Sequence, residues 1–215
     1  MSEAIARTMP GQIARRIRQK ILSGSYAPGM QLLQDSIAAD FGVSKIPVRE
    51  ALVQLKSEGL VDIFAHRGFQ VRRTSTAEMA EVFNLRLAIE PAAAAKGARL
   101  AGPDERQSAR AALQILDSAL ASGDLSQCGD LNSAFHLALV VPHRQPLTAD
   151  SLYRLHTLSQ RYVRLHLQSD YHIEWAVEEH RGLFEVWAAG RPRQTAERVR
   201  RHIEATRDDL ASVLT

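Results

Sequence analysis

Three histidines in the second half of the chain, His136, His180 and His202, could hold a metal ion. Asn132 and His136 are four residues apart and therefore share one face of a predicted helix. His180 lies on the apolar face of a later helix, and His202 lies on the last one. Imidazole nitrogens suit Zn, Ni or Fe. Local spacing cannot show whether side chains from three helices meet, and a buried histidine is often a hydrogen-bonded core residue. The three histidines could therefore be either metal ligands or core residues.

The second half of the chain also contains a cysteine and four further histidines, and none of them belongs to a recognisable metal-binding motif. Cys128 is the only cysteine of the chain, so it cannot form an internal disulfide, and we interpret it as a small core residue in a reduced compartment. We interpret the remaining histidines as ordinary surface or core residues: His143, His156, His166 and His172.

A second set of candidate functional side chains is basic and lies in the first third of the chain. Residues 1–76 hold 11 Lys and Arg against 6 Asp and Glu, a balance of +5, whereas residues 77–215 hold 16 against 18, a balance of −2. Such an excess suits a polyanion such as DNA, although a solvated surface can also carry it. Lys45, Arg49 and Lys56 lie on the polar side of a predicted helix, where Arg and Lys can pair with guanine or phosphate.

Three short helices and a hairpin must position these basic side chains. Isoleucines at helical spacing predict a helix over about residues 10–23, and a second, short helix ends at Gly42. Ser44 is a good N-cap for a third helix, which ends near Glu58. Two partly alternating apolar runs on either side of residues 65–68 predict a β-hairpin. Together these elements make a winged helix-turn-helix.

The elements that must position the histidines are all helices. Ser75 and Glu78 fit a capping box, which marks the start of a second domain. The rest of the pattern predicts an antiparallel bundle of six helices, over about residues 76–100, 104–122, 125–141, 147–169, 172–189 and 193–213. We therefore predict a mainly α protein with two domains, residues 1–75 and 76–215.

The composition places these domains in a soluble protein of the cytoplasm. With 45% hydrophobic and 24% charged residues, the chain is an ordinary globular one. No apolar run approaches the roughly 20 residues that cross a bilayer, and the first residues lack the apolar stretch of a signal peptide. We expect no membrane partner.

An ordered motif runs through the first domain, from Ser23-Gly24 and Pro28-Gly29 through residues 41–52 to Glu58-Gly59-Leu60. It resembles the DNA-binding domain of the GntR family of bacterial transcription regulators. The resemblance implies that the third helix enters the major groove of DNA and that the wing touches the backbone or minor groove. The DNA-contacting residues that it implies are Ser44, Lys45, Ile46, Arg49, His66, Arg67 and Gly68.

This chain departs from the usual family pattern at Lys45-Ile46, where the family commonly has Arg followed by a small hydroxyl residue. Lys lacks the planar fork that reads guanine with two hydrogen bonds. Ile46 could contact a thymine methyl group or simply fill a contact. The departure therefore bears on which DNA sequence is preferred.

A second group of matching residues runs through the helical domain: Leu85-Arg86 with Glu90, Phe135-His136, Glu179-His180 and His202. They resemble the ligand-binding FCD domain of the FadR subfamily, and six helices look more like its VanR-type branch. Metal-binding FCD domains hold a divalent cation with Asp-x-x-x-His on one helix and two further histidines. The resemblance thus implies a site of His136, His180 and His202, with Asn132 at the Asp position, where an amide lacks the carboxylate's charge.

The same resemblance implies an effector, most simply a small organic acid. A carboxylate could complete the coordination of a Zn, Ni or Fe ion held by the three histidines. Arg86 could pair with that carboxylate through two hydrogen bonds, or it could form an ion pair with Glu90 one helical turn later.

Both resemblances imply a ligand-responsive transcription regulator that binds a pseudo-palindromic operator as a homodimer. A metabolite would shift it between DNA-competent and incompetent arrangements. Two alternatives remain. In one, the three histidines hold a catalytic zinc in a metalloenzyme, although no Asp or Glu is placed by motif as a general base. In the other, a DNA-binding protein without an effector keeps these histidines in its core.

Overall fold

The structure, a computed structural model, describes residues 8–65, 67–123, 127–166 and 170–213, the side chains of residues 164–172 excepted. The chain divides into two compact units, Met1–Thr74 and Ser75–Thr215. Within the described residues, none of the helices combines the length and the apolar character needed to cross a bilayer.

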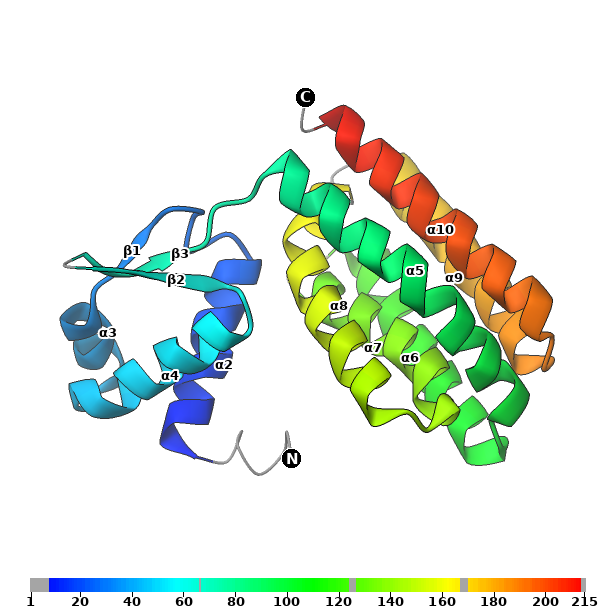
Figure 1. Ribbon diagram of the computed structural model, residues 1–215, viewed down its shortest axis with the longest axis horizontal. Helices are drawn as coiled ribbons and strands as arrows, with labels where there is room; N and C mark the ends of the chain where they lie inside the picture. The colour runs from blue at the N-terminus through cyan, green and yellow to red at the C-terminus, as the bar shows by residue number, and fades with distance from the viewer. Residues whose placement is uncertain (1–7, 66, 124–126, 167–169, 214–215) are drawn as a thin grey trace. The chain divides into compact units, whose positions relative to one another are not determined.

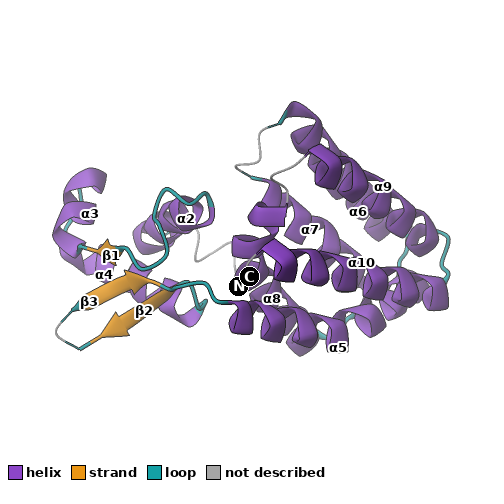
Figure 2. Ribbon diagram, turned by 90° about the horizontal axis from the view of Figure 1, so that it is seen from above, coloured by secondary structure: helices purple, strands orange, loops and turns teal. Residues whose placement is uncertain are grey.

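The described residues of the N-terminal unit form three helices and a small antiparallel sheet (Figures 1 and 2). The helices are α2 (Met9–Leu22), α3 (Gln34–Phe41) and α4 (Lys45–Ser57). The sheet has the order β1 (Gln31–Leu32), β3 (Gly68–Val71), β2 (Val61–Phe64). The predicted hairpin is thus confirmed, whereas strand β1 is not among the predicted elements. That strand has only two residues, too few to show an alternating pattern, and it forms because β3 offers a free edge.

The core of this unit fixes which face of α4 is exposed. Val48, Leu52 and Leu55 of α4 are fully buried and belong to the same apolar cluster as residues of α2. Arg18 of α2 binds both carboxylate oxygens of Glu58 at the end of α4, at 2.8 and 2.5 Å. The opposite side of α4 therefore remains available to a partner.

The C-terminal unit is a bundle of helices (Figure 2). Its described α-helices match the six predicted ones closely: α5 (Thr76–Leu100), α6 (Pro103–Ser122), α7 (Cys128–Val140), α8 (Pro146–His166), α9 (Asp170–Ala188) and α10 (Pro192–Val213). A 3-10 turn over Val141–His143 lies between α7 and α8. Cys128 is buried in the apolar core, as expected.

Helix α5 contacts four other helices of this bundle, α7, α8, α9 and α10. Ser75 caps it by accepting a hydrogen bond from the Glu78 backbone N–H at 3.1 Å. The Glu78 carboxylate binds Arg161 and Tyr162 of α8, at 2.6 and 2.8 Å. These contacts tie the first turn of α5 to α8.

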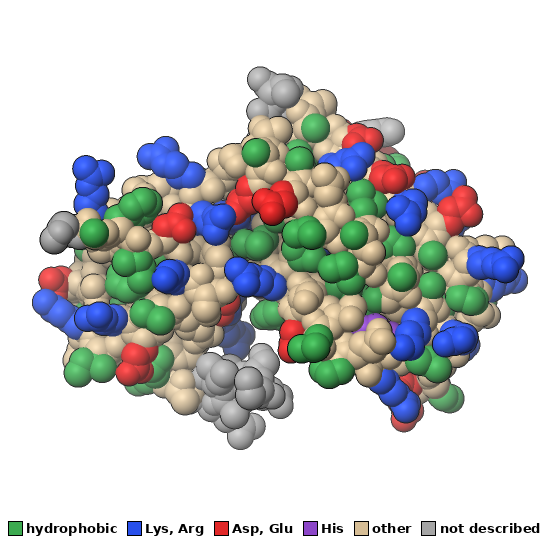
Figure 3. Space-filling model, in the orientation of Figure 1, with side chains coloured by type: hydrophobic (Ala, Val, Ile, Leu, Met, Phe, Trp, Pro, Cys, Tyr) green, Lys and Arg blue, Asp and Glu red, His purple; other side chains and the backbone are tan. Residues whose placement is uncertain are grey.

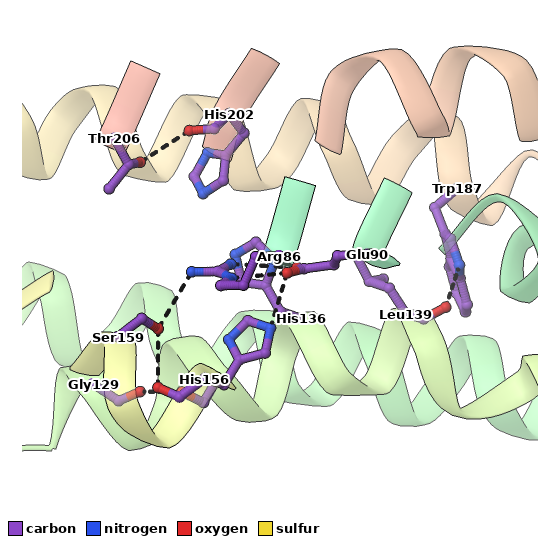
Figure 4. A network of polar contacts seen from close by, with 11 residues as sticks. Arg86, Glu90, Gly129, His136, Leu139, His156, Ser159, Trp187, His202 and Thr206 are labelled. Carbon is purple, nitrogen blue, oxygen red and sulfur yellow. Dashed lines mark hydrogen bonds and ion pairs between the residues drawn. The ribbon is translucent and has the colours of Figure 1, made fainter. Parts of the chain in front are cut away.

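A close approach holds the far end of α5 against α7. A Cβ atom at Gly97 would lie 2.0 Å from the carbonyl oxygen of Leu139, so only glycine fits there. The same oxygen accepts a hydrogen bond from Trp187 Nε1 of α9 at 2.9 Å. Three helices are thus fixed around one carbonyl group, beside the region that holds the histidines (Figure 4).

Candidate functional site

Three histidines from three helices meet in the interior of the C-terminal unit. His136 lies on α7, His180 on α9 and His202 on α10, and all three are buried. One ring nitrogen of each lies within 4.8 Å of those of the other two. Figure 3 accordingly shows only a small area of histidine on the face that it draws. The tertiary structure therefore groups the three residues that local spacing could not.

Aromatic neighbours fix the orientation of these rings. The indole of Trp175 stacks on His202, with ring centres 5.6 Å apart and planes 3° apart. The ring of Phe135 meets His180 edge-on at 5.3 Å. Such contacts hold an imidazole in one orientation, as a metal ligand requires.

Two of the imidazole nitrogens are buried without a hydrogen-bond partner among the described residues. They are His136 Nε2 and His202 Nδ1. Leaving a buried polar atom unsatisfied costs about 1–3 kcal/mol, so native proteins rarely do it without a reason. A metal ion bound between the histidines would take up both lone pairs. The donor set thus fits the divalent cation that the resemblance implied.

The protonation state of His202 also favours a metal. Burial lowers the pKa of His202 well below its ordinary value, and the neighbouring His180 and His136 lower it further. The ring is therefore neutral at pH 7, which is the form that binds a metal ion.

A small cavity adjoins the histidines, with a volume of about 20 Å³. Asn132 lines it together with Arg86, His180 and His202. A cavity must offer roughly 10–15 Å³ to hold one water molecule, so this one has room for an ion or a water but not for an organic acid. Asn132 lies one helical turn before His136 and lines the same cavity as His180 and His202.

Arg86 and Glu90 form a buried ion pair on α5. The guanidinium donates from Nε to Glu90 Oε2 at 2.9 Å and from Nη2 to Glu90 Oε1 at 3.4 Å. A third contact runs from Nη1 to the hydroxyl of Ser159 on α8 at 3.3 Å. The structure therefore forms the ion pair, one of the two roles considered for Arg86, while the same side chain still borders the cavity.

Glu90 joins this ion pair to the histidines (Figure 4). Its Oε1 lies 2.9 Å from His136 Nδ1, and its Oε2 lies 3.2 Å from His156 Nε2. Burial by itself would raise the pKa of Glu90, but the cation of Arg86 and the contacts with His156 and His136 together hold it well below its ordinary value. Glu90 is therefore a buried carboxylate that stays ionised.

His156 is the residue that the sequence analysis did not connect to the site. Burial, and next to it the charge of Arg86, lower the pKa of His156 to about 4, although Glu90 acts in the opposite direction. A signal was present in the sequence, since His156 lies one turn after Leu152 on the apolar side of α8. That pattern indicates burial but not which side chain the ring will meet. His143 is also buried, while the side chains of His166 and His172 lie outside the described residues.

The predicted DNA-contacting residues of α4 lie at its exposed N-terminal end. Ser44 occupies the N-cap position, although its side chain makes no capping hydrogen bond. Lys45 Nζ lies 2.5 Å from Asp35 of α3, in an exposed ion pair of the kind that contributes little to stability and so can be exchanged for another partner. Arg49 is exposed, and Ile46 is 70% exposed, which is unusual for an apolar side chain of its size.

Two of the predicted wing residues, Arg67 and Gly68, lie where the turn after β2 leads into β3. Arg67 and Gly68 are exposed, and Gly68 has a φ of 73°, a left-handed conformation that favours glycine. Gln31 of β1 donates a hydrogen bond to the carbonyl of Arg67 at 2.8 Å, which supports the wing from its neighbouring strand. His66 lies outside the described residues. In Figure 3, several Lys and Arg side chains stand out from the surface of this unit.

Comparison with known proteins gives matches over both units. Residues 10–71 match the bacterial regulatory proteins of the gntR family, and residues 81–205 match the FCD domain. An HTH-type transcriptional regulator in an unstable DNA locus of Streptomyces ambofaciens is 31% identical over 99% of this chain and 89% of its own length. A probable D-xylose utilization operon transcriptional repressor of Paenarthrobacter nicotinovorans is 26% identical over 92% and 87%.

A solved structure shares the fold over nearly the whole chain. The structure of E. coli McbR/YncC superimposes with a TM-score of 0.84 at 19% identity, covering 97% of this chain and 99% of that one. The family matches and the relative from Streptomyces ambofaciens together cover both units. The chain therefore belongs to the GntR family of bacterial DNA-binding transcription regulators, in the FadR-like group whose C-terminal domain is an FCD domain.

Proposed function

We propose that this regulator responds to a divalent metal ion together with a small carboxylate effector, both bound in the FCD domain. The observation that carries the proposal is the group of three buried histidines, two of whose ring nitrogens have no hydrogen-bond partner among the described residues. His136, His180 and His202 would hold the ion, and Asn132 would supply a weak fourth ligand. The ion, when bound, would offer a Lewis-acid position of the Zn, Ni or Fe class to an anion.

The charges around the site support an anionic effector. The nearest donors are imidazoles and the amide of Asn132, and the cation of Arg86 is already balanced by Glu90. The proposed ligands therefore carry no net negative charge to balance a buried divalent cation. A carboxylate would supply that charge, and Arg86 borders the cavity in a position to meet it.

The size of the cavity suggests how binding would be transmitted. At about 20 Å³, it cannot admit an organic acid unless the helices around it move apart. A ligand that binds only the expanded arrangement shifts the protein towards that arrangement. Such a shift would change the spacing of two DNA-binding domains in a homodimer and hence the affinity for a pseudo-palindromic operator.

The N-terminal domain would read the operator with the start of α4 and with the wing. Arg49 is the best candidate for a guanine contact, because its guanidinium can donate two parallel hydrogen bonds to O6 and N7. Ser44, Lys45 and Ile46 would lie beside it in the major groove, and His66, Arg67 and Gly68 would contact the backbone or the minor groove. The exposure of Ser44, Lys45, Ile46 and Arg49 at the N-terminal end of α4 supports the roles in the major groove.

Selection of genomic fragments by the full-length protein, followed by binding titrations, tests this function. Chelator-stripped protein is titrated with a selected site and with a shuffled duplex, alone, with zinc, and with zinc plus a panel of small mono- and dicarboxylates. We expect preference for the selected site and a change in affinity when zinc and one carboxylate are both present.

Two variants separate the two halves of the proposal. Arg49→Lys keeps the charge but loses the planar fork, so it should lose preference for the selected site while zinc binding stays unchanged. His180→Ala should keep the preference for the site and lose the response to zinc. A response of the His180→Ala protein equal to that of the unaltered protein would contradict a metal-dependent effector site.

A further inference from the structure

We infer that Glu90 is a positioning residue for the metal centre: it holds His136 with the proton on Nδ1, so that Nε2 is the atom presented to the metal. This inference rests on the proposed metal centre. It assigns to Glu90, and to the Arg86 and His156 side chains around it, a role in metal binding without direct contact with the metal.

The geometry of His136 carries the first step. Its Nδ1 lies 2.9 Å from Glu90 Oε1, and both side chains are 1% exposed. A carboxylate can only accept a hydrogen bond, so this contact requires the proton on Nδ1. The lone pair of a neutral ring is then on Nε2, the atom left without a hydrogen-bond partner among the described residues. A carboxylate behind a histidine in this way both fixes its tautomer and makes it a better ligand.

The surroundings of Glu90 carry the second step, because they prevent the carboxylate from turning away. Arg86 contacts both of its oxygens, and His156 lies 3.2 Å from Oε2. Arg86 is itself held by Ser159, whose hydroxyl also bonds to the carbonyl of His156 at 2.9 Å. Glu90 is thus fixed from α5 and α8 while it faces α7, as Figure 4 shows.

The same contacts disfavour a second metal ion between Glu90, His136 and His156. Glu90, His136 and His156 also place ligand atoms within 4.8 Å of one another. The guanidinium of Arg86, however, already binds both oxygens of Glu90 in a fully buried place. A divalent ion there would lie beside a buried cation and would compete with it for the same two oxygens. These residues are therefore better suited to orient His136 than to form a second centre.

The test compares Glu90→Gln with a matched control on the same helix. The control is Glu78→Gln, which likewise removes a carboxylate that binds an arginine, here Arg161 of α8. Glu78 lies about 18 Å along α5 from Glu90. Zinc affinity is measured by calorimetry on chelator-stripped full-length protein. Losing an orienting carboxylate typically costs about 10–100-fold in metal affinity, so Glu90→Gln should bind zinc that much more weakly and Glu78→Gln should not.

A second readout reports the tautomer directly and needs no metal. In 15N-histidine-labelled, metal-free protein, NMR should show the His136 proton on Nδ1, and in Glu90→Gln a shift towards Nε2, because a glutamine amide can also donate to Nδ1. The unaltered protein alone can refute the inference, so it stays testable even if Glu90→Gln does not fold. A neutral His136 with its proton on Nε2 would overturn it.

The outcomes also separate this inference from the proposed function. Absence of zinc binding in the unaltered protein would remove the metal centre, whereas the tautomer measurement would still show whether Glu90 orients His136. Zinc binding that is equal in the unaltered protein and in Glu90→Gln would leave the metal centre in place and overturn the role of Glu90. Two zinc ions per chain, falling to one in Glu90→Gln, would also overturn it in favour of a second centre.

Discussion

At the scale of single residues, a substitution of Asn132 should have a large effect on the zinc affinity of the proposed metal centre. It lines the same cavity as His180 and His202 and offers a neutral amide at the position where the family resemblance implies a carboxylate. Asn132→Asp adds an anionic ligand, so zinc affinity should rise by about tenfold or more, equivalent to about 1.4 kcal/mol. The new charge should also reduce the benefit of an added carboxylate effector. Calorimetry on chelator-stripped protein measures both effects.

His180→Ala serves as the comparison for that experiment, because it removes one of the three imidazole ligands and should lower zinc affinity sharply. If the unaltered protein, Asn132→Asp and His180→Ala all bound zinc equally, the histidines would be ordinary core residues.

Ile46 is the residue whose exposure predicts a feature of the operator. An isoleucine that is 70% exposed at the start of a recognition helix can bury itself against the methyl group of thymine. Replacing that thymine by uracil removes one methyl group, which should weaken binding by about 0.8 kcal/mol, or roughly fourfold. Gel-shift titrations with singly substituted operators measure this loss. The Ile46→Ala protein should be insensitive to the same substitution, and an unchanged penalty in that variant would show that Ile46 does not read the methyl.

At the scale of elements, the contact between α5 and α7 depends on Gly97. In a helix, Gly→Ala normally stabilises by up to about 1 kcal/mol through helix propensity. Here the added Cβ would lie 2.0 Å from the Leu139 carbonyl oxygen, so Gly97→Ala should instead destabilise, by about 1–3 kcal/mol. Urea unfolding followed by tryptophan fluorescence gives the sign of the change. A more stable Gly97→Ala protein would mean that the two helices are not so closely packed.

The contacts between α5 and α8 predict how stability depends on pH. The pKa of His156 is about 4 in the folded protein, against about 6.5 for an unfolded chain. Between these values the unfolded chain binds the proton and the folded protein does not, so this contribution to stability is lost as pH falls from 6.5 towards 4. The lowered pKa of Glu90 acts in the same direction at lower pH.

Urea unfolding of chelator-treated protein at several pH values measures this dependence. The free energy of unfolding should rise with pH by a few kcal/mol at most between pH 4 and pH 6.5. In His156→Gln the rise should be smaller, because the titrating ring is gone. An identical slope in the two proteins would show that His156 is not buried in neutral form.

At the scale of the whole molecule, the proposed function requires a dimer. Two copies related by a two-fold axis can place two recognition helices on two half-sites, which doubles the contacts with DNA. Light scattering should therefore give a mass of about twice 23.8 kDa. A protein that stayed monomeric at micromolar concentration and still bound an intact operator with one copy per site would argue against this assembly.

Much of the fold could be predicted from the sequence, because helices are determined by local interactions. Apolar residues at helical spacing, together with caps such as Ser75 and breaks such as Gly42, placed the described helices within a few residues of their observed ends. The short strand β1 could not be predicted in this way. Its two residues become a strand only through pairing with Phe69 and Gln70, which lie far away in the sequence.

In the candidate site, too, contacts within one helix can be predicted from the sequence, whereas contacts between helices cannot. Residue spacing alone places Arg86 and Glu90 on one helix face and Asn132 and His136 on another, because positions four residues apart meet on any α-helix. The contact of Glu90 with His136, 46 residues later, depends instead on how α5 packs against α7.

The packing of helices likewise decided the rest of the site. Because α5 contacts α7 and α8, the Glu90 carboxylate lies between His136 and the otherwise unassigned His156. Helical periodicity acts over a few residues and fixes which face of a helix is apolar. It leaves open which helix will cover that face, since this depends on how all the side chains of the bundle fit together.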